Sequence, residues 1–190
     1  IIKKLLIFLL IISFIGAISA NVIMNIALKD SPKPTYAYMK EKSVSSEYVS
    51  ISKIPVDLQH AIVSIEDERF FDHKGVDYLS LTRSVVHNIF SKSTQGGSTL
   101  EMQVSKNLLT SMDQTIKRKI KDIYNARQMD KNMNKREILE LYLNNMYLGK
   151  GIYGAQKGAQ VYFGKDVSEL NLGECALLAG ITNRPGLYSK

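Results

Sequence analysis

The chain has 190 residues, 45% of them hydrophobic, which is enough for one domain with a buried core. Its formal net charge of +7 suits nucleic acid, anionic lipid or a phosphorylated substrate, and it does not choose among them. The single cysteine, Cys175, excludes an internal disulfide and a Cys/His metal-ligand spacing, and we expect it to be a small buried apolar side chain.

The N-terminal segment has the pattern of a membrane anchor. Lys3 and Lys4 precede about 24 uncharged residues that end at Leu28, a length that can cross a bilayer. A cleaved signal peptide is the alternative, since AISA at residues 17–20 fits a cleavage site. We favour a retained single-pass transmembrane helix over residues 1–28, because the apolar run exceeds a signal-peptide core. The lysines place the N-terminus inside, so the rest of the chain is expected on the extracytoplasmic face of the cell membrane, which argues against nucleic acid as a partner.

Residues 29–55 are predicted to form a linker and entry segment. Pro32 and Pro34 disfavour regular structure there, and the alternation in SEYVSIS, residues 46–52, predicts one short strand. Beyond Pro55 the apolar residues recur with helical spacing. We therefore expect one mostly α-helical domain over residues 56–190.

The helices of this domain are expected at positions set by capping residues and apolar faces. One helix ends at Glu66, four others are opened by Asp77, Ser98, Asn134 and Asn171, a long basic helix surrounds Ile116–Tyr124, and another covers residues 155–163. The helix after Asn171 is expected to stop at Gly180. The expected inward faces are Leu58, Ala61, Ile62 and Ile65 in the first helix and Tyr78, Thr82, Val85, Val86 and Ile89 in the second.

The densest group of titratable residues is SIEDERFFDHKGVD, residues 64–77. Its acids follow an apolar helix directly and alternate with two phenylalanines, so we expect at least one carboxylate against apolar surface, as a general acid or base near neutral pH requires. Glu66 is the best placed. His73 is expected to be a hydrogen-bonded structural histidine rather than a metal ligand, because no second ligand lies at a suitable spacing.

A second group, TQGGSTLEMQVSKN at residues 94–107, has the composition of a phosphate-binding loop. It is not a nucleotide-binding P-loop, which needs a lysine immediately before Ser98. The backbone amides after Gly97 are expected to open a helix, whose N-terminus is a natural site for an anion.

Five stretches of the chain, in order, resemble the signature motifs of the peptidoglycan glycosyltransferases (family 51 glycosyltransferases), found as monofunctional transglycosylases and in class A penicillin-binding proteins. They are EDERFFDHKG, GGSTLEMQVSKN, RKIKD, KREILELYLNNMYLGKGIYGAQKGAQVYFGK and LNLGECALLAGITNRPGLYS. The resemblance covers residues 55–189, and five motifs in order are far more specific than one.

This resemblance implies a lysozyme-like α-helical fold behind the transmembrane helix, with a membrane-adjacent lobe and a long cleft. It also implies a reaction in which the 4-hydroxyl of an acceptor GlcNAc attacks the anomeric carbon of lipid II with inversion, so that a glycan strand grows and undecaprenyl pyrophosphate leaves. Glu66 falls on the family's catalytic glutamate. The implied partners are lipid II, the growing strand, the membrane and other cell-wall synthase proteins.

The other site residues implied by the resemblance belong to the donor pyrophosphate. Lys106 resembles a lysine that contacts it, and Asp122 falls on a catalytic motif whose lysine and acid share a helix face. The residues expected to bind substrate are Gly97, Ser98, Gln103, Lys106, Arg118 and Lys119. No metal-binding residues and no tightly bound cofactor are expected, although Mg²⁺ or Mn²⁺ could assist the pyrophosphate. For the fourth motif we expect scaffold, with Glu140 a buried structural partner and Gly149, Gly151 and Gly154 in turns.

The chain departs from the family pattern on the donor side. Glu101 replaces a threonine, Met102 a glutamine, Gln114 a common arginine, and Asp122 a glutamate. A carboxylate gained there weakens anion binding by Coulomb's law, unless Glu101 only completes a capping box with Ser98, the interpretation we favour. These departures keep two alternatives open: a catalytically weak or inactive, membrane-tethered relative that binds lipid II or a partner, and a lysozyme-like glycan hydrolase. The chain starts at Ile1 and stops just after the fifth motif, so we expect residues beyond both ends.

Overall fold

The computed structural model describes residues 33–91, 96–110 and 115–188, with six further positions between 11 and 22; the side chains of Val85 and Tyr188 are outside this description. The chain divides into two compact units, Ile1–Lys33 and Pro34–Lys190. Among the described residues no helix has the length and apolarity needed to cross a bilayer. Most of the predicted anchor over residues 1–28 lies outside the described residues, so the anchor remains a prediction. Gln114 also lies outside them, so the expected effect of this departure from the family pattern remains a prediction as well.

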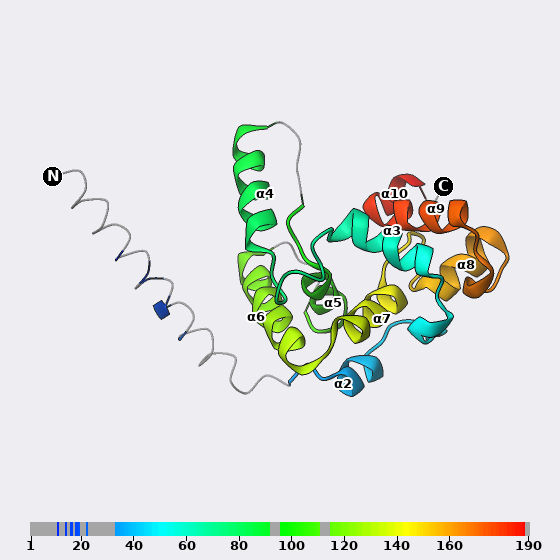
Figure 1. Cartoon of the computed structure of the whole chain (residues 1–190), viewed down its shortest axis with the longest axis horizontal. Coiled ribbons are helices and arrows are strands. Elements are labelled where there is room, and N and C mark those ends of the chain that lie inside the picture. The colour runs from blue at the N-terminus through cyan, green and yellow to red at the C-terminus, as the bar shows by residue number, and fades with distance from the viewer. Residues whose placement is uncertain are drawn as a thin grey trace. The chain divides into compact units, whose positions relative to one another are not determined.

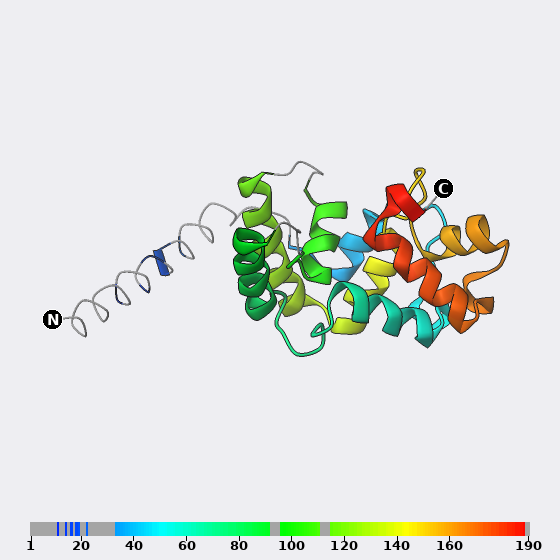
Figure 2. The same ribbon diagram turned by 90° about the horizontal axis from the view of Figure 1, so that it is seen from above.

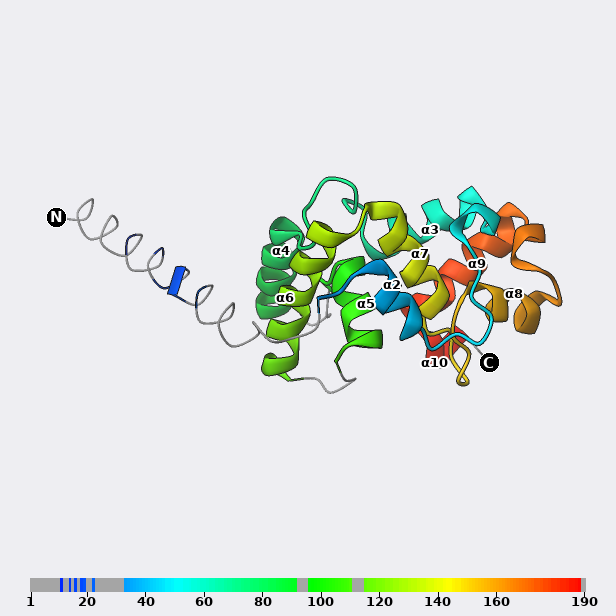
Figure 3. The same ribbon diagram turned by 90° about the horizontal axis from the view of Figure 1, so that it is seen from below.

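The second unit is helical, as predicted, and the described residues contain no strand beyond an isolated antiparallel bridge between Tyr147 and Tyr153. Its elements are α2 (Tyr36–Glu41), the 3₁₀ helix η1 (Ile51–Lys53), α3 (Val56–Glu66), α4 (Tyr78–Phe90), α5 (Leu100–Leu108), α6 (Ile116–Asn132), α7 (Lys135–Asn145), α8 (Ala155–Phe163), the 3₁₀ helix η2 (Val167–Glu169), α9 (Leu172–Asn183) and α10 (Pro185–Tyr188). Within this unit α4 and α6 lie at one end and α8 lies at the other, in each of three views (Figure 1, Figure 2 and Figure 3).

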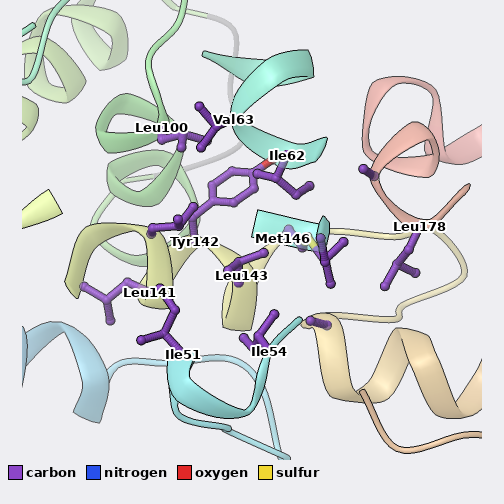
Figure 4. Close-up of a cluster of buried hydrophobic side chains, with 14 of the residues drawn as sticks. Ile51, Ile54, Ile62, Val63, Leu100, Leu141, Tyr142, Leu143, Met146 and Leu178 are labelled. Carbon is purple, nitrogen blue, oxygen red and sulfur yellow. The ribbon is translucent and has the colours of Figure 1, made fainter. Parts of the chain in front are cut away.

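Helix α7 forms the centre of the core. Eight of its residues, from Ile138 to Asn145, are buried in succession, and α2, α5, α8 and η1 pack against it. Figure 4 shows its side chains meeting those of α3, α5 and η1, with Tyr142 reaching from α7 toward α3. Asn134 and Glu137 make the predicted capping box at the start of α7, and Asn171 and Glu174 make another at α9. Cys175 is free and fully buried, as predicted.

The entry segment is held by side chains of α7. It does not form the strand predicted over residues 46–52, so that prediction is wrong. Asn144 exchanges hydrogen bonds with both backbone groups of Val49, at 2.8 Å each. Asn145 accepts from the Val44 amide, and Glu140 accepts from the Ile51 amide at 2.8 Å. Backbone groups that a strand partner would satisfy are therefore satisfied by buried amides and a carboxylate. Glu140 is the buried structural partner that the sequence predicted.

Three other sequence predictions are wrong at the level of single residues. Ile65 is 44% exposed, because α3 ends at an open cavity and Val63 takes the buried position instead. Helix α9 runs past Gly180 to Asn183. The N-cap of α5 is Thr99, whose hydroxyl accepts from the Met102 amide, and not Ser98.

The predicted apolar face of α4 also differs from the structure. Tyr78, Val86 and Ile89 are 59%, 49% and 68% exposed, whereas Ser84 is buried. The reason is a close approach at Gly97, where an added Cβ would lie 2.3 Å from the Ser84 hydroxyl and 3.1 Å from the Leu81 Cα. Helix α4 therefore turns small side chains inward and leaves larger apolar ones at the surface.

Candidate active site

One cavity of about 1110 Å³ is lined by all of the predicted site residues. The end of α3 and the loop after it form one part of its wall, and the start of α4 with residues 96–99 forms another. Helix α5, the first half of α6 and the end of α9 complete it. Glu66, Asp122 and all six predicted substrate-binding residues line this cavity, so segments up to 116 residues apart in sequence meet there.

Glu66 is the last residue of α3 and is half-buried at the cavity wall. Both of its carboxylate oxygens accept hydrogen bonds. Gln103 Nε2, from α5, donates to Oε2 at 2.7 Å, and Thr182 Oγ1, from α9, donates to Oε1 at 2.6 Å. A carboxylate held by two donors from two other helices has a fixed orientation.

Three cations lie together on α5 and α6. Burial is the main cause that lowers the pKa of Lys106, and the Arg118 charge lowers it further, while Glu66 and Asp122 raise it. Burial also lowers the pKa of Lys119, opposed by Asp122. Lys119 Nζ donates to Ser98 Oγ at 2.6 Å, which places Ser98 beside the cations. The positive charges of these side chains repel one another, and the neighbouring carboxylates balance them only in part. A group of cations of this kind can receive an anion.

Asp122 is fully surrounded by donors. It is 1% exposed, its Oδ1 accepts from Ser105 Oγ and Thr110 Oγ1 at 2.8 Å each, and its Oδ2 is paired with Arg118 Nη1 at 2.5 Å. Arg118 and Asp122 are thus an i,i+4 ion pair of α6 whose carboxylate is buried. Asp122 thus fixes the direction of Arg118 and has little free capacity for a further ligand.

The N-terminus of α5 differs from the predicted anion site. The Leu100 amide donates to Asp67 Oδ2 at 3.0 Å, and the Met102 amide donates to its own cap, Thr99. Thr99 Oγ1 in turn donates to the Gly75 carbonyl at 2.7 Å. Since the Leu100 and Met102 amides are already bonded within the protein, these two amides are not free to bind an anion in the cavity.

Glu101 has a different role from the one expected. It is fully buried, does not line the cavity, and is paired with Lys135 of α7 at 2.7 Å rather than with the Ser98 amide. Burial raises the pKa of Glu101, against the charge and hydrogen bond of Lys135. The capping-box interpretation is therefore wrong, and so is the concern that this carboxylate repels an anion in the cavity.

His73 is the hydrogen-bonded histidine that the sequence predicted, since its Nε2 lies 2.9 and 3.0 Å from the two oxygens of Asp67. Sequence spacing did not reveal that Glu101 lies close by: ligand atoms of Asp67, His73 and Glu101 fall within 4.8 Å of one another. This geometry could admit a metal ion. However, Asp67 is already bonded to His73 and to the Leu100 amide, and Glu101 is already bonded to Lys135.

Several cavity residues had been missed. Thr182 contacts Glu66 directly, and Arg69, Arg83 and Arg184 add positive charge to the wall. The fifth motif, which contains Thr182, was recognised in the sequence, but nothing in its spacing linked a residue near the end of α9 to the end of α3.

A half-buried carboxylate in one cavity with a group of half-buried cations is the arrangement of a site that transfers a group away from an anion. The comparison with known families agrees: the transglycosylase family model matches residues 33–190, and the chain belongs to this family. The resemblance identified from the five motifs is thereby confirmed.

Individual relatives carry the same names. The chain is 46% identical over 139 residues to a Cupriavidus necator protein that bears the transglycosylase name, which covers 73% of the chain and 60% of that protein. It is 44% identical over 143 residues to penicillin-binding protein 1A of Aquifex aeolicus, covering 75% of the chain and 20% of that protein. With penicillin-binding protein 1A of Streptococcus pneumoniae the identity is 46% over 138 residues, covering 71% and 19%. The chain thus spans 60% of the first relative and about a fifth of the other two.

Proposed function

We propose that this protein polymerises lipid II into peptidoglycan glycan strands by inverting glycosyl transfer. The observation that carries the proposal is the pairing, in one cavity, of a doubly hydrogen-bonded Glu66 with the cations Lys106, Arg118 and Lys119. The relatives named transglycosylase and penicillin-binding protein 1A support the same chemistry. A lysozyme-like relationship of the fold is part of the proposal and agrees with a mostly helical domain.

In this mechanism Glu66 is the general base. The acceptor 4-hydroxyl attacks the anomeric carbon, the bond from that carbon to the pyrophosphate oxygen breaks, and the hydroxyl proton passes to Glu66. Gln103 and Thr182 hold the carboxylate so that an unshared lone pair can face the acceptor. Since the carboxylate is fixed before substrate arrives, little reorganisation is needed at the moment of transfer.

The leaving pyrophosphate would be received by Lys106, Arg118 and Lys119, which are held in place by the protein. Negative charge grows on the bridging oxygen as the bond breaks, and fixed cations in a partly desolvated wall stabilise it. Asp122 would act on this step through Arg118, because its oxygens accept from Arg118, Ser105 and Thr110. Mg²⁺ or Mn²⁺ could assist, held mainly by the pyrophosphate oxygens, since Asp122 offers little free ligand capacity.

Membrane association is a further part of the proposal. Helix α4 exposes Tyr78, Leu79, Ile89 and Phe90, at 59%, 65%, 68% and 83%. Large apolar side chains gathered on one surface helix are typical of contact with a membrane or a protein. We place α4 at the bilayer, where the lipid tail of the donor would remain, and the catalytic domain on the extracytoplasmic face, with cell-wall synthase proteins as neighbours.

Product analysis separates this function from the two alternatives. The full chain is incubated with lipid II and, in parallel, with polymeric peptidoglycan, with and without Mg²⁺. We expect long glycan strands from lipid II and no shortening of the polymer. Shortened polymer would indicate a hydrolase, and binding of lipid II without product under both metal conditions would indicate a non-catalytic relative.

A further inference from the structure

The hydroxyl of Thr182 has more partners than its single proton can serve. Its Oγ1 lies 2.6 Å from Glu66 Oε1 and 2.7 Å from the carbonyl oxygen of Ala179, one turn earlier in α9. Both partners are acceptors, so the hydroxyl can donate to only one of them at a time. The carboxylate takes this proton when it is charged, because hydrogen bonds to charged acceptors are the stronger ones.

A buried phenol of the core lies near the same pair of groups. Tyr142 is 2% exposed. Burial, and then the charge of Glu66, raises the pKa of Tyr142 well above its usual range, and the neighbouring Thr182 hydroxyl opposes this. The side chain therefore stays a neutral phenol at neutral pH. Figure 4 shows Tyr142 pointing from α7 toward α3, the helix that ends at Glu66.

We propose that Thr182 is a positioning residue for Glu66 and that its hydroxyl reverses its hydrogen bond when the carboxylate takes up the acceptor's proton. Before transfer, Thr182 donates to Glu66 Oε1. After transfer, the proton rests on the Glu66 carboxyl, which donates it in a hydrogen bond to Thr182 Oγ1. The Thr182 hydroxyl then turns to the Ala179 carbonyl, which is already within reach. This change requires only the rotation of two hydroxyl groups, that of Thr182 and that of the protonated Glu66 carboxyl. Glu66 therefore keeps a hydrogen bond to Thr182 in both of its protonation states.

This inference rests on the proposed role of Glu66 and adds a residue to it. Gln103 cannot serve the same purpose, because its amide nitrogen only donates. Valine has the shape of threonine but lacks the hydroxyl, and serine keeps the hydroxyl, so Thr182→Val and Thr182→Ser form a matched pair. Thr82→Val is the control, since Thr82 makes a comparable bond to a helix carbonyl, that of Tyr78, on an exposed surface of α4.

The first readout is kinetic and uses the full chain with lipid II. For Thr182→Val we expect kcat to fall about tenfold with KM within about twofold of wild type, as for a residue that acts in the chemical step. Thr182→Ser and Thr82→Val should keep the wild-type kcat and KM, because both proteins retain a hydroxyl at position 182.

The second readout does not depend on activity, so it separates failure of this inference from failure of the proposed function. The Glu66 carboxyl carbon is followed by ¹³C NMR in glutamate-labelled protein and assigned by its loss in Glu66→Gln. At neutral pH its resonance should change position in Thr182→Val, because the carboxylate has lost a hydrogen-bond donor, and stay at the wild-type position in Thr182→Ser. A Thr182→Val protein whose carboxyl resonance stays at the wild-type position, or a Thr182→Ser protein that shifts equally, overturns the inference. Thr182→Ala, a second hydroxyl-free variant, replaces valine if circular dichroism shows that the valine protein does not fold.

Discussion

Glu101 shows how a single substitution in a functional motif can be structural. The carboxylate stands in the middle of the loop motif, yet it points away from the cavity and pairs with Lys135, which also contacts Asp130 and the Phe70 ring. A fully buried carboxylate without a cation is costly, since charge is poorly solvated there. The positive charge of Lys135 thus offsets the free-energy cost of burying the Glu101 carboxylate at this position.

Replacing Lys135 by methionine should therefore destabilise the fold while sparing the cavity. We expect the free energy of unfolding to fall by about 3 kcal/mol, as when one partner of a buried ion pair is removed. Urea unfolding followed by circular dichroism measures this. Lys157→Met is the control, because the side chains of the Lys157–Glu47 pair are 44% and 30% exposed and the pair should be worth less than about 1 kcal/mol. Equal losses in the two variants would contradict a special role of Lys135.

The sequence could locate Glu66 and the cations but not the partners of Glu101 or Glu66. Lys135 is 34 positions from Glu101, and Thr182 is 116 positions from Glu66. Local spacing on one helix identifies neighbours three or four residues apart, such as the paired Arg118 and Asp122. Contacts between the ends of different helices depend on how those helices pack, which a single sequence does not state.

At the level of elements, the caps Asp77, Asn134 and Asn171 were predicted correctly because cap chemistry is local, whereas Ser98 was wrong by one residue. Asp77 caps α4 as expected: its Oδ1 accepts from the amides of Leu79 and Ser80, and its Oδ2 from the Ser80 hydroxyl. Burial opposes ionisation of Asp77, but the bonds from Ser80 and Leu79 and the charge of Arg69 lower its pKa overall. The predicted strand before α3 failed because its backbone partners are side chains of α7, far along the chain.

The cap of α4 makes a prediction about pH. A carboxyl whose pKa is lower in the folded than in the unfolded protein stabilises the fold above the unfolded pKa, and this contribution is lost as the pH falls through the folded pKa. Asp77→Asn keeps the shape and loses the charge, so wild type should be more stable at pH 7 by on the order of 1 kcal/mol. The difference should close below about pH 4, as measured by thermal unfolding of both proteins from pH 7 to 3. A difference that stays constant over this range would contradict the assignment.

For the molecule as a whole, the sequence predicted the helical class, and the site residues that it singled out lie along one cavity, because both follow from patterns of residues along the chain. It did not predict the exposed apolar surface of α4. Tyr78, Val86 and Ile89 have the spacing of a buried face, and apolar spacing alone does not state what covers a face. Here the close approach of Gly97 to Ser84 decides which side of α4 is inward.

The proposed contact of α4 with the bilayer can be tested by fluorescence, because the chain has no tryptophan. Phe90 is 83% exposed, so Phe90→Trp introduces a single reporter with little effect on packing. In vesicles of anionic phospholipid its emission should shift to the blue and resist quenching by iodide, since indole prefers the membrane interface. Leu177→Trp, on α9, is the control and should emit as in water. Identical emission from the two reporters would contradict the placement of α4.

The central claim is that Glu66 is the base of a lipid II polymerase, and one substitution tests it most directly. Glu66→Gln keeps the size of the side chain and removes its ability to accept a proton, so the full chain should fold, bind lipid II and form no glycan strands at any pH at which wild type does. Strand length and rate are measured on labelled lipid II, with circular dichroism and lipid II binding measured on the same samples. If Glu66→Gln, folded and bound to lipid II, polymerised at the wild-type rate, the account of this site would be wrong.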